Sequence, residues 1–425
     1  MLKRAFDAIG WLGTALVVAA VAVFLAAGAN LGHRRRLVLA FLAAASAVVL
    51  AGGRIAAVGP AAEVLTGFTG LICDHGDGAI LPGLVNCHVH LEFSALAGKV
   101  PPQARWEDWL EAALGAYGAL SPAEVEAGIS RGVDALRQSG AVLVGEVTNT
   151  GASWPFLTTG PLAYHLFYEC LGFDLVSAFN LPAKFPWFGR SEVAGTAWVS
   201  AAAHALYSVS AALFRAVAAW NRARSGVQTV HLAESQAEID FLAKGDGFFE
   251  GLLKRRGRWV PDFQPPGAGA AAYLDGLGFL GPRTLTVHGT RLSSADIARL
   301  AGTGTWLALC PRANRYTGAG SPPVPDLLKA GVNLCLGTDS LAGNWDLNLF
   351  GEMLWLHENF PAWPGDLWLR LGTLNGAETL GRDREFGSLT PGKQAALGFI
   401  PLNRGRDFWG ELFAQGAAGK WRWLG

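Results

Sequence analysis

Residues 81–94 read LPGLVNCHVHLEFS, an apolar run that ends in two histidines separated by a single residue. Alternate side chains of a β-strand point to the same side, so His88 and His90 can direct two imidazoles at one metal ion. One HxH pair is weak evidence for a metal site. Its weight depends on whether other metal-binding residue types follow at similar places in the chain.

Three later segments supply such residues. His231 lies in TVHLAES, His288 in TVHGT and Asp339 in LGTDS, and each follows a short apolar run and precedes a polar or glycine-containing turn. Residues at the carboxyl ends of the strands of a β/α barrel occupy this position, and the active sites of such barrels lie there. The pattern therefore indicates a hydrolase that uses a metal ion.

Strand-like and helix-like segments alternate between these motifs. Helical segments begin with capping signals such as the serine of Ser121-Pro122-Ala123-Glu124. The apolar runs expected to be strands are 79–85, 141–148, 163–170, 197–203, 227–232, 284–287, 305–309 and 333–336. Strands that alternate with helices over about 270 residues predict an α/β fold of the (β/α)8 TIM-barrel type.

The two ends of the chain do not follow the barrel pattern. VVLAGGRIAAVG (48–59) and FGSLTPGKQAALGFI (386–400) both read as short strands with glycine or proline turns. We expect them to form one small β-sandwich, built from residues 33–78 and 383–425. The barrel domain is then expected to be 79–382.

An uncharged apolar run of 19 residues, 11–29, precedes these domains. As a helix it would span about 28 Å, close to the thickness of the bilayer core. Basic residues flank both ends, so the flanking charges set no orientation. We expect residues 1–32 to be an extension outside the active site and a candidate membrane anchor, with the catalytic domain in the cytoplasm.

The composition narrows the choice of partners. The 425-residue chain carries 34 basic and 34 acidic residues, and no long basic run marks a nucleic-acid surface. Its five cysteines contain no CxxC pair, which favours reduced thiols in a cytosolic domain. We expect a small-molecule substrate and no nucleic acid, with membrane contact only through residues 11–29; a homodimer is left open.

The motifs PGLVNCHVH, HLAES, VHGT, LGTDS and GSLTPGK together resemble the amidohydrolase superfamily from about Val48 to the carboxyl terminus. The metal ligands implied by this resemblance are His88, His90, His231 and Asp339. It also implies that Glu234 and His288 transfer protons, and that Asp339 accepts a proton from water while it binds the ion. Imidazole and carboxylate ligands suit Zn²⁺ or Fe²⁺, and such an ion lowers the pKa of bound water from about 16 towards about 7.

The number of metal ions follows from the fourth expected strand. Relatives with two metal ions use a carboxylated lysine there, whereas the corresponding segment of this chain is TAWVSAAAHALYS, without lysine. We therefore expect one divalent ion.

Further segments resemble one subgroup of the superfamily. HALYSVS resembles a segment of purine-type and other aminohydrolase deaminases, and CPRANRYTGAG resembles a segment of deaminases. HLEFS, GEVTNT, FYECLGF and LGTDSLAGN are similar to segments of the aminodeoxyfutalosine deaminases of menaquinone biosynthesis, in the group that also contains chlorohydrolase-like relatives. The substrate-binding residues implied are His204, Arg312, Asn314, Glu92 and Glu169. The structural alternative is a loop arginine that caps a helix and buried glutamates that anchor hydrogen bonds.

The hypothesis that results is a metal-dependent deaminase. It would release ammonia from an aromatic amine, most simply an adenosine-like nucleoside such as aminodeoxyfutalosine, by attack of hydroxide formed at the metal. One alternative is an s-triazine or guanine-type deaminase or dechlorinase with the same site. The other is an inactive, membrane-anchored barrel scaffold, against which the intact ligand set and Glu234 argue. The other zinc deaminase fold requires HxE with PCxxC, and the sequence contains no such pair.

Overall fold

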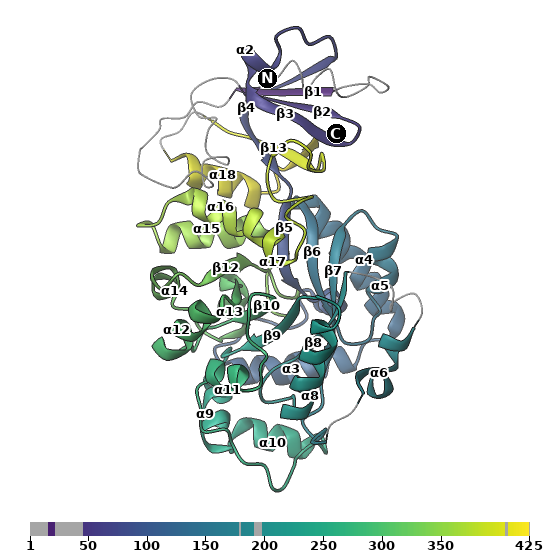
Figure 1. Ribbon diagram of the computed structural model, residues 1–425, viewed down its shortest axis with the longest axis vertical. Helices are drawn as coiled ribbons and strands as arrows, with labels where there is room; N and C mark the ends of the chain where they lie inside the picture. Colours follow the sequence, from purple (N-terminus) through teal and green to yellow (C-terminus); the bar gives the residue numbers. More distant parts are fainter. Residues whose placement is uncertain (1–15, 22–45, 178–179, 191–197, 404–406, 425) are drawn as a thin grey trace. The chain divides into compact units, whose positions relative to one another are not determined.

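The computed structural model describes residues 16–21, 46–177, 180–190, 198–403 and 407–424 (Figure 1). The chain divides into two compact units. The smaller consists of Met1–Gly83 with Arg384–Gly425, and the larger is Leu84–Asp383.

In the described part of the larger unit, eight parallel strands form two four-stranded sheets. The first sheet contains β5 (Leu84–Val89), β6 (Ala141–Thr148), β7 (Ala163–Cys170) and β8 (Val199–Ala203), and the second contains β9 (Gln228–Leu232), β10 (Thr284–His288), β11 (Trp306–Leu309) and β12 (Asn333–Leu336). Parallel bridges join the two sheets at both seams, Ala205 to His231 and Val89 to Asp339. The strands therefore close on themselves, and the predicted (β/α)8 barrel is confirmed.

Helices follow the strands of the barrel along the chain and flank them (Figure 1). They are η2 (Leu91–Leu96), α3 (Trp106–Gly118), α4 (Pro122–Gln138), α5 (Trp154–Thr158), α6 (Leu181–Lys184), η3 (Pro186–Gly189), α8 (Ala211–Arg222), α9 (Gln236–Lys244), α10 (Phe248–Arg255), α11 (Ala270–Gly276), α12 (Ser294–Thr303), α13 (Pro311–Thr317), α14 (Val324–Ala330), α15 (Leu349–Asn359), α16 (Gly365–Leu371) and α17 (Leu374–Thr379). Ser121 begins α4 with a complete capping box to Glu124, as its sequence predicts. Every residue of β5, β6, β8, β9 and β10 is buried, because helices cover one face of the barrel sheet and side chains fill the interior.

The first predicted strand, 79–85, is in fact two strands. Its beginning belongs to β4 (Leu71–Pro82) of the smaller unit and its end to β5. The change of sheet occurs at Gly83, whose backbone nitrogen donates to the Ala396 carbonyl oxygen at 2.8 Å, whereas the nitrogen of Leu84 donates to Gly140 at 2.8 Å. A continuous apolar run cannot reveal such a change, because the end of β4 and the whole of β5 are both largely apolar.

The two ends of the chain share one six-stranded sheet in the smaller unit, in the order β14-β13-β4-β1-β2-β3. Its remaining strands are β1 (Leu16–Val21), β2 (Ser46–Ala51), β3 (Arg54–Pro60), β13 (Leu397–Pro401) and β14 (Arg422–Leu424), accompanied by helices α2 (Ala61–Val64) and α18 (Phe408–Ala417). Val48 and Leu50 of β2 pack in one apolar cluster with Leu397 and Phe399 of β13. The prediction that the chain ends form one small β domain is confirmed.

The amino-terminal apolar run differs from the predicted helix. Leu16–Val21 forms β1, which pairs antiparallel with β2 and parallel with β4. A strand inside a sheet satisfies its backbone hydrogen bonds through its neighbours, so an apolar run need not be helical. The expectation that residues 1–32 stand apart from the small domain is wrong for these six residues, and the rest of 11–29 lies outside the described residues. Within the described ranges, no helix combines the length and apolar character needed to cross a membrane.

Candidate active site

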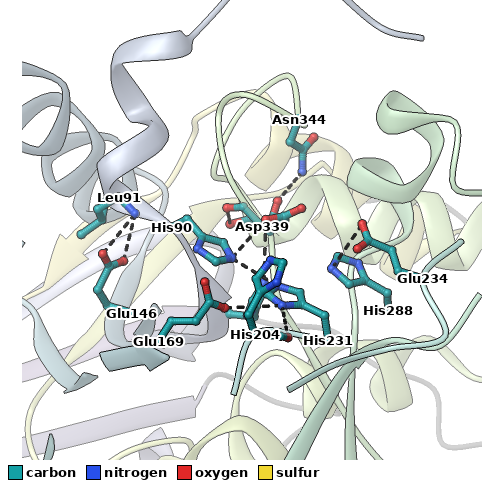
Figure 2. A network of polar contacts seen from close by, with 12 residues as sticks. His90, Leu91, Glu146, Glu169, His204, His231, Glu234, His288, Asp339 and Asn344 are labelled. Carbon is teal, nitrogen blue, oxygen red and sulfur yellow. Dashed lines mark hydrogen bonds and ion pairs between the residues drawn. The ribbon is translucent and has the colours of Figure 1, made fainter. Parts of the chain in front are cut away.

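Four side chains meet at the carboxyl ends of three barrel strands. They are His88 in β5, His90 directly after it, His231 in β9 and Asp339 after β12. The Nε2 atoms of His90 and His231 lie 3.4 Å apart, and the Nε2 atoms of His88 and His90 each lie 3.8 Å from the Asp339 Oδ1. Figure 2 shows His90, His231 and Asp339 directed toward one another. The structure thus brings all four predicted ligands together in a buried cluster.

The hydrogen bonding and charge of these histidines fit a divalent cation. Buried polar groups nearly always have a hydrogen-bond partner, yet neither ring nitrogen of His88 has one among the described residues, nor has Nδ1 of His90. Burial, followed by the neighbouring imidazoles, holds the pKa of both rings well below the usual value. Neutral imidazoles with unused nitrogen atoms beside a carboxylate are the donor set that such an ion requires.

His231 is oriented by its second ring nitrogen. Its Nδ1 lies 2.8 Å from the carbonyl oxygen of His204. Because a carbonyl oxygen only accepts, Nδ1 carries the proton and Nε2 is free to bind a metal ion. Burial lowers the pKa of His231 to about 3, which keeps this ring neutral.

The backbone after β12 aims Asp339 into the barrel mouth. Its φ is 57°, in the left-handed region that residues other than glycine rarely adopt. Its backbone nitrogen donates to the carbonyl oxygen of His88 at 3.0 Å, which ties the turn to β5. The preceding Gly337 permits this approach, since a Cβ atom there would lie 2.8 Å from the Cβ of His88.

Glu234 lies beside this cluster and has the properties of a proton carrier. The turn that leads to it passes through Ala233, whose φ is 50°, and the Glu238 carboxylate accepts from the backbone nitrogens of Ala233 and Glu234 at 3.0 Å each. The indole nitrogen of Trp106 donates to Glu234 Oε1 at 2.7 Å. Burial raises the pKa of Glu234 to about 7, so near neutral pH this carboxyl can both take up and release a proton.

His288 is held between Glu234 and Asn314. Its Nε2 lies 3.6 Å from Glu234 Oε1 (Figure 2), and its Nδ1 lies 2.8 Å from Asn314 Oδ1. With Asn314 as the acceptor, Nδ1 carries the proton and Nε2 faces the site with its lone pair. His288 also has a left-handed φ of 72°, as the last residue of β10.

A cavity of about 630 Å³ opens from the ligand cluster. The residues at its polar end include His90, His231, Glu234, His288 and Asp339. Most of the remaining wall is aromatic or aliphatic and includes Phe93, Trp106, Trp109, Tyr117, Phe173, Tyr207 and Phe249. This size and character suit an organic molecule with one polar, reacting end.

Two of the predicted substrate-binding residues line this cavity. His204 follows β8 and its Nδ1 lies 2.6 Å from the Ser208 hydroxyl oxygen. Glu169, in β7, has Oε1 3.5 Å from Nδ1 of His231 and accepts from the Asn149 side chain at 2.8 Å. Both are therefore placed to contact a substrate, and both also support the ring of His231.

Arg312 and Asn314 do not line the cavity, contrary to their predicted role. The Arg312 guanidinium binds Asp346 through two contacts of 2.8 Å, and its backbone nitrogen donates to Glu352 Oε2 at 2.9 Å. Asn314 is fully buried behind His288. Both lie in α13 after β11, and the position of a residue after a strand does not determine which way its side chain points.

Glu92 likewise supports the site from outside the cavity wall. Its carboxylate accepts from the hydroxyl of Thr148 and, at 3.2 Å each, from the backbone nitrogens of Asn149, Thr150 and Ala152. Glu92 therefore holds the loop that follows β6. This is the structural role, a buried anchor for hydrogen bonds, that was considered as the alternative to substrate binding.

Two further residues shape the site and are not among the sequence candidates. Trp106 comes from α3, in a segment without any motif, and nothing in the sequence distinguishes it from the other tryptophans. Glu146 lies in the quoted segment GEVTNT and accepts from the backbone nitrogen of Leu91 at 3.0 and 3.2 Å, which holds the turn after His90 (Figure 2). The sequence did contain a signal for Glu146, because an acidic residue within an apolar strand is expected to be buried and to need hydrogen-bond partners.

Comparisons with known proteins agree with this geometry. The model of the amidohydrolase family matches residues 79–406. The chain is 28% identical over 383 residues to a 5-methylthioadenosine/S-adenosylhomocysteine deaminase of Syntrophobacter fumaroxidans, covering 83% of this chain and 78% of that protein. It is 26% identical over 355 residues to an aminodeoxyfutalosine deaminase of Deinococcus radiodurans, covering 79% and 81%. The fold matches the crystal structure of a Xanthomonas campestris adenosine deaminase with bound zinc, with a TM-score of 0.76 at 23% identity, covering 96% of this chain and 90% of that one.

Proposed function

Because this chain belongs to the amidohydrolase family and is a metal-dependent deaminase, we propose that its substrate is an adenosine-like nucleoside and that its metal ion is Zn²⁺. The observation that carries the proposal is the place of Glu234, which lines the same mostly apolar cavity as His90, His231 and Asp339 and accepts a hydrogen bond from Trp106. The relatives are named as deaminases of 5-methylthioadenosine and S-adenosylhomocysteine, and of aminodeoxyfutalosine. Zinc is proposed from the three-imidazole, one-carboxylate donor set, which suits this ion.

The reaction exchanges an amine for an oxygen. Water adds to the ring carbon that bears the amine, the carbon–nitrogen bond breaks, and ammonia leaves. A bound divalent ion supplies Lewis acidity that lowers the pKa of water at the site. Glu234 takes a proton from the water and returns it to the ring nitrogen or the leaving amine. Nε2 of His288 lies 3.6 Å from Glu234 Oε1 and has a lone pair. It can therefore accept a hydrogen bond from the attacking water and hold its oxygen in position.

The apolar part of the cavity is the reason to prefer a nucleoside with a substituted 5′ position. Adenine and ribose alone would leave the space beside Trp109, Tyr117 and Phe249 unfilled. A 5′ substituent can fill that space and contact these side chains. Aminodeoxyfutalosine, 5′-methylthioadenosine and S-adenosylhomocysteine all belong to this class. A role in menaquinone biosynthesis is part of the proposal only for the first of these.

Ammonia release from a defined panel tests the proposal. The panel contains adenosine, the three 5′-substituted nucleosides, guanine and an s-triazine, with chloride release measured for a chlorinated triazine. We expect turnover of the nucleosides and one zinc ion per chain by elemental analysis. Turnover of the triazine or guanine alone would refute the nucleoside assignment in favour of the alternative hydrolase.

Two substitutions separate metal binding from proton transfer. Glu234→Gln should retain the ion and lose activity by about 10²- to 10⁴-fold, because it removes only the proton carrier. His88→Ala should lose the ion, since it removes a ligand. Near wild-type turnover by Glu234→Gln would contradict the role given to Glu234.

A further inference from the structure

The helices α4, α9 and α12 each follow an N-cap serine, with an acidic residue three positions after the serine. In α4 and α12 both halves of the capping box form. The serine hydroxyl accepts from the backbone nitrogen of the acidic residue, and the acidic side chain accepts from the backbone nitrogen of the serine. The carboxylates of Glu124 and Asp296 thus satisfy the amino termini of their own helices.

The acidic residue of α9, Glu238, bonds elsewhere. Its backbone nitrogen still donates to the Ser235 hydroxyl, at 3.2 Å. Its carboxylate, however, reaches farther back along the chain. Oε1 accepts from the backbone nitrogen of Ala233 and Oε2 from that of Glu234, both at 3.0 Å. The side chain is fully buried, so this carboxylate serves the active-site turn instead of its own helix.

The turn held in this way is strained. Ala233 has a φ of 50°, and such a conformation persists only where the surrounding structure imposes it. Ala233 and Glu234 are both buried, so their N–H groups depend on Glu238 for an acceptor. Glu234 directly follows the strained residue. Any change in the dihedral angles of Ala233 therefore redirects the Glu234 side chain.

The carbonyl groups of the same two residues are held by the segment that follows β10. The Thr290 hydroxyl donates to the carbonyl oxygen of Glu234 at 2.6 Å, and the backbone nitrogen of Arg291 donates to that of Ala233 at 2.9 Å. Thr290 lies two residues after His288. The turn is therefore bound through its carbonyl groups to the segment that carries the second reacting group, and through its N–H groups to the carboxylate of α9.

We propose that Glu238 is a positioning residue for proton transfer, because its two oxygens hold the strained turn at Ala233 and thereby fix the direction of Glu234. This inference rests on the proposed function, in which Glu234 carries the proton. Glu238 is not among the residues that line the cavity, so it acts through Glu234. The position requires an acid, because both terminal atoms of the side chain must accept and an amide has only one acceptor atom.

Glu238→Gln tests this role, because glutamine keeps the size of the side chain and places an amide nitrogen against one of the two N–H donors. The assay is run above pH 8, since burial raises the pKa of Glu238 to about 8, and it uses the substrate that the wild-type enzyme turns over fastest. We expect kcat to fall about 10- to 100-fold, as a small misplacement of a reacting group does, with KM and metal content unchanged. An unchanged kcat would refute the inference. Loss of the ion would also refute it, because Glu238 would then support the fold of the metal site.

A double variant shows whether Glu238 acts through Glu234. In the Glu234→Gln background, Glu238→Gln should lower the residual kcat by less than about threefold, because the group that it positions is already gone. A larger loss in that background would overturn the inference.

Asp240→Asn is the matched control. It makes the same change from carboxylate to amide at an exposed position of α9, so it should keep the wild-type kcat. A loss as large as that of Glu238→Gln would assign the effect to the charge of α9 instead of the two hydrogen bonds, which would also overturn the inference.

Failure of this inference differs from failure of the proposed function. The proposed function fails in the wild-type enzyme, if no nucleoside of the panel releases ammonia. If the wild-type enzyme turns over only guanine or a triazine, the variants still test Glu238 with that substrate. The inference fails in the variants, if an active wild-type enzyme and Glu238→Gln have the same kcat.

Discussion

Glu352 is a buried acid whose titration can be followed through protein stability. It lies in α15, is fully buried, and accepts from the backbone nitrogen of Arg312 at 2.9 Å and from the Asn344 side chain at 3.0 Å. Asn344 in turn donates to the carbonyl oxygen of Thr338, next to Asp339. Burial raises the pKa of Glu352 from 4.5 to about 7, although the charge of Arg312 acts in the opposite direction.

The sign of the pH effect follows from this elevated pKa. Between pH 4.5 and 7 the folded state holds the Glu352 proton more tightly than the unfolded state does. The contribution of Glu352 to the free energy of unfolding is therefore fully present below pH 4.5 and is lost as the pH rises through 7. The interval from 4.5 to about 7 corresponds to about 3 kcal/mol.

Glu352→Gln removes the titration and keeps the shape of the side chain. At pH 5 the variant should be less stable than wild type by about 1 to 2 kcal/mol, because an amide nitrogen cannot accept one of the two hydrogen bonds. As the pH rises to 8, this difference should shrink by about 3 kcal/mol and can change sign. Other buried acids, such as Glu238, are present in both proteins, so their titration cancels.

Urea unfolding of the metal-loaded protein, followed by tryptophan fluorescence from pH 5 to 8, measures this difference. Glu358→Gln, at an exposed position of the same helix, is the control and should keep a constant difference from wild type. A stability difference between wild type and Glu352→Gln that does not change with pH would refute the reasoning.

Three substitutions test the support of the reacting groups. Trp106→Phe removes the donor to Glu234 and should lower kcat by roughly 10- to 100-fold at unchanged metal content, because a hydrogen bond to a charged group contributes about 1.5 to 3 kcal/mol; loss of the ion would contradict this. Asn314→Ala removes the acceptor that fixes the proton of His288 and should lower kcat about tenfold or more, so an unchanged kcat would exclude an orienting role. His204→Ala should raise KM with the ion retained, as elemental analysis alongside steady-state kinetics can show; a fall in metal occupancy would place His204 nearer the ion.

Much of the barrel could be predicted from the sequence. The expected strands 141–148, 163–170 and 333–336 have the same bounds as β6, β7 and β12. Buried parallel strands are continuous apolar runs, and polar residues directly after them must lie at one end of the barrel. For this reason the positions of His231 and Asp339 at their strand ends indicated a shared site before any contact was known.

Only the tertiary structure determined which groups the side chains around that site contact. Arg312 and Glu92 were predicted at the substrate, but one pairs with Asp346 and the other holds a loop, because the direction of a side chain after a strand depends on local dihedral angles and on neighbours distant in sequence. Trp106 reaches Glu234 across 128 positions of the chain, and no local pattern encodes such a contact. The strand β1 was hidden for a related reason: an apolar run has the same composition in a helix and in a sheet, and only the presence of pairing partners selects between them.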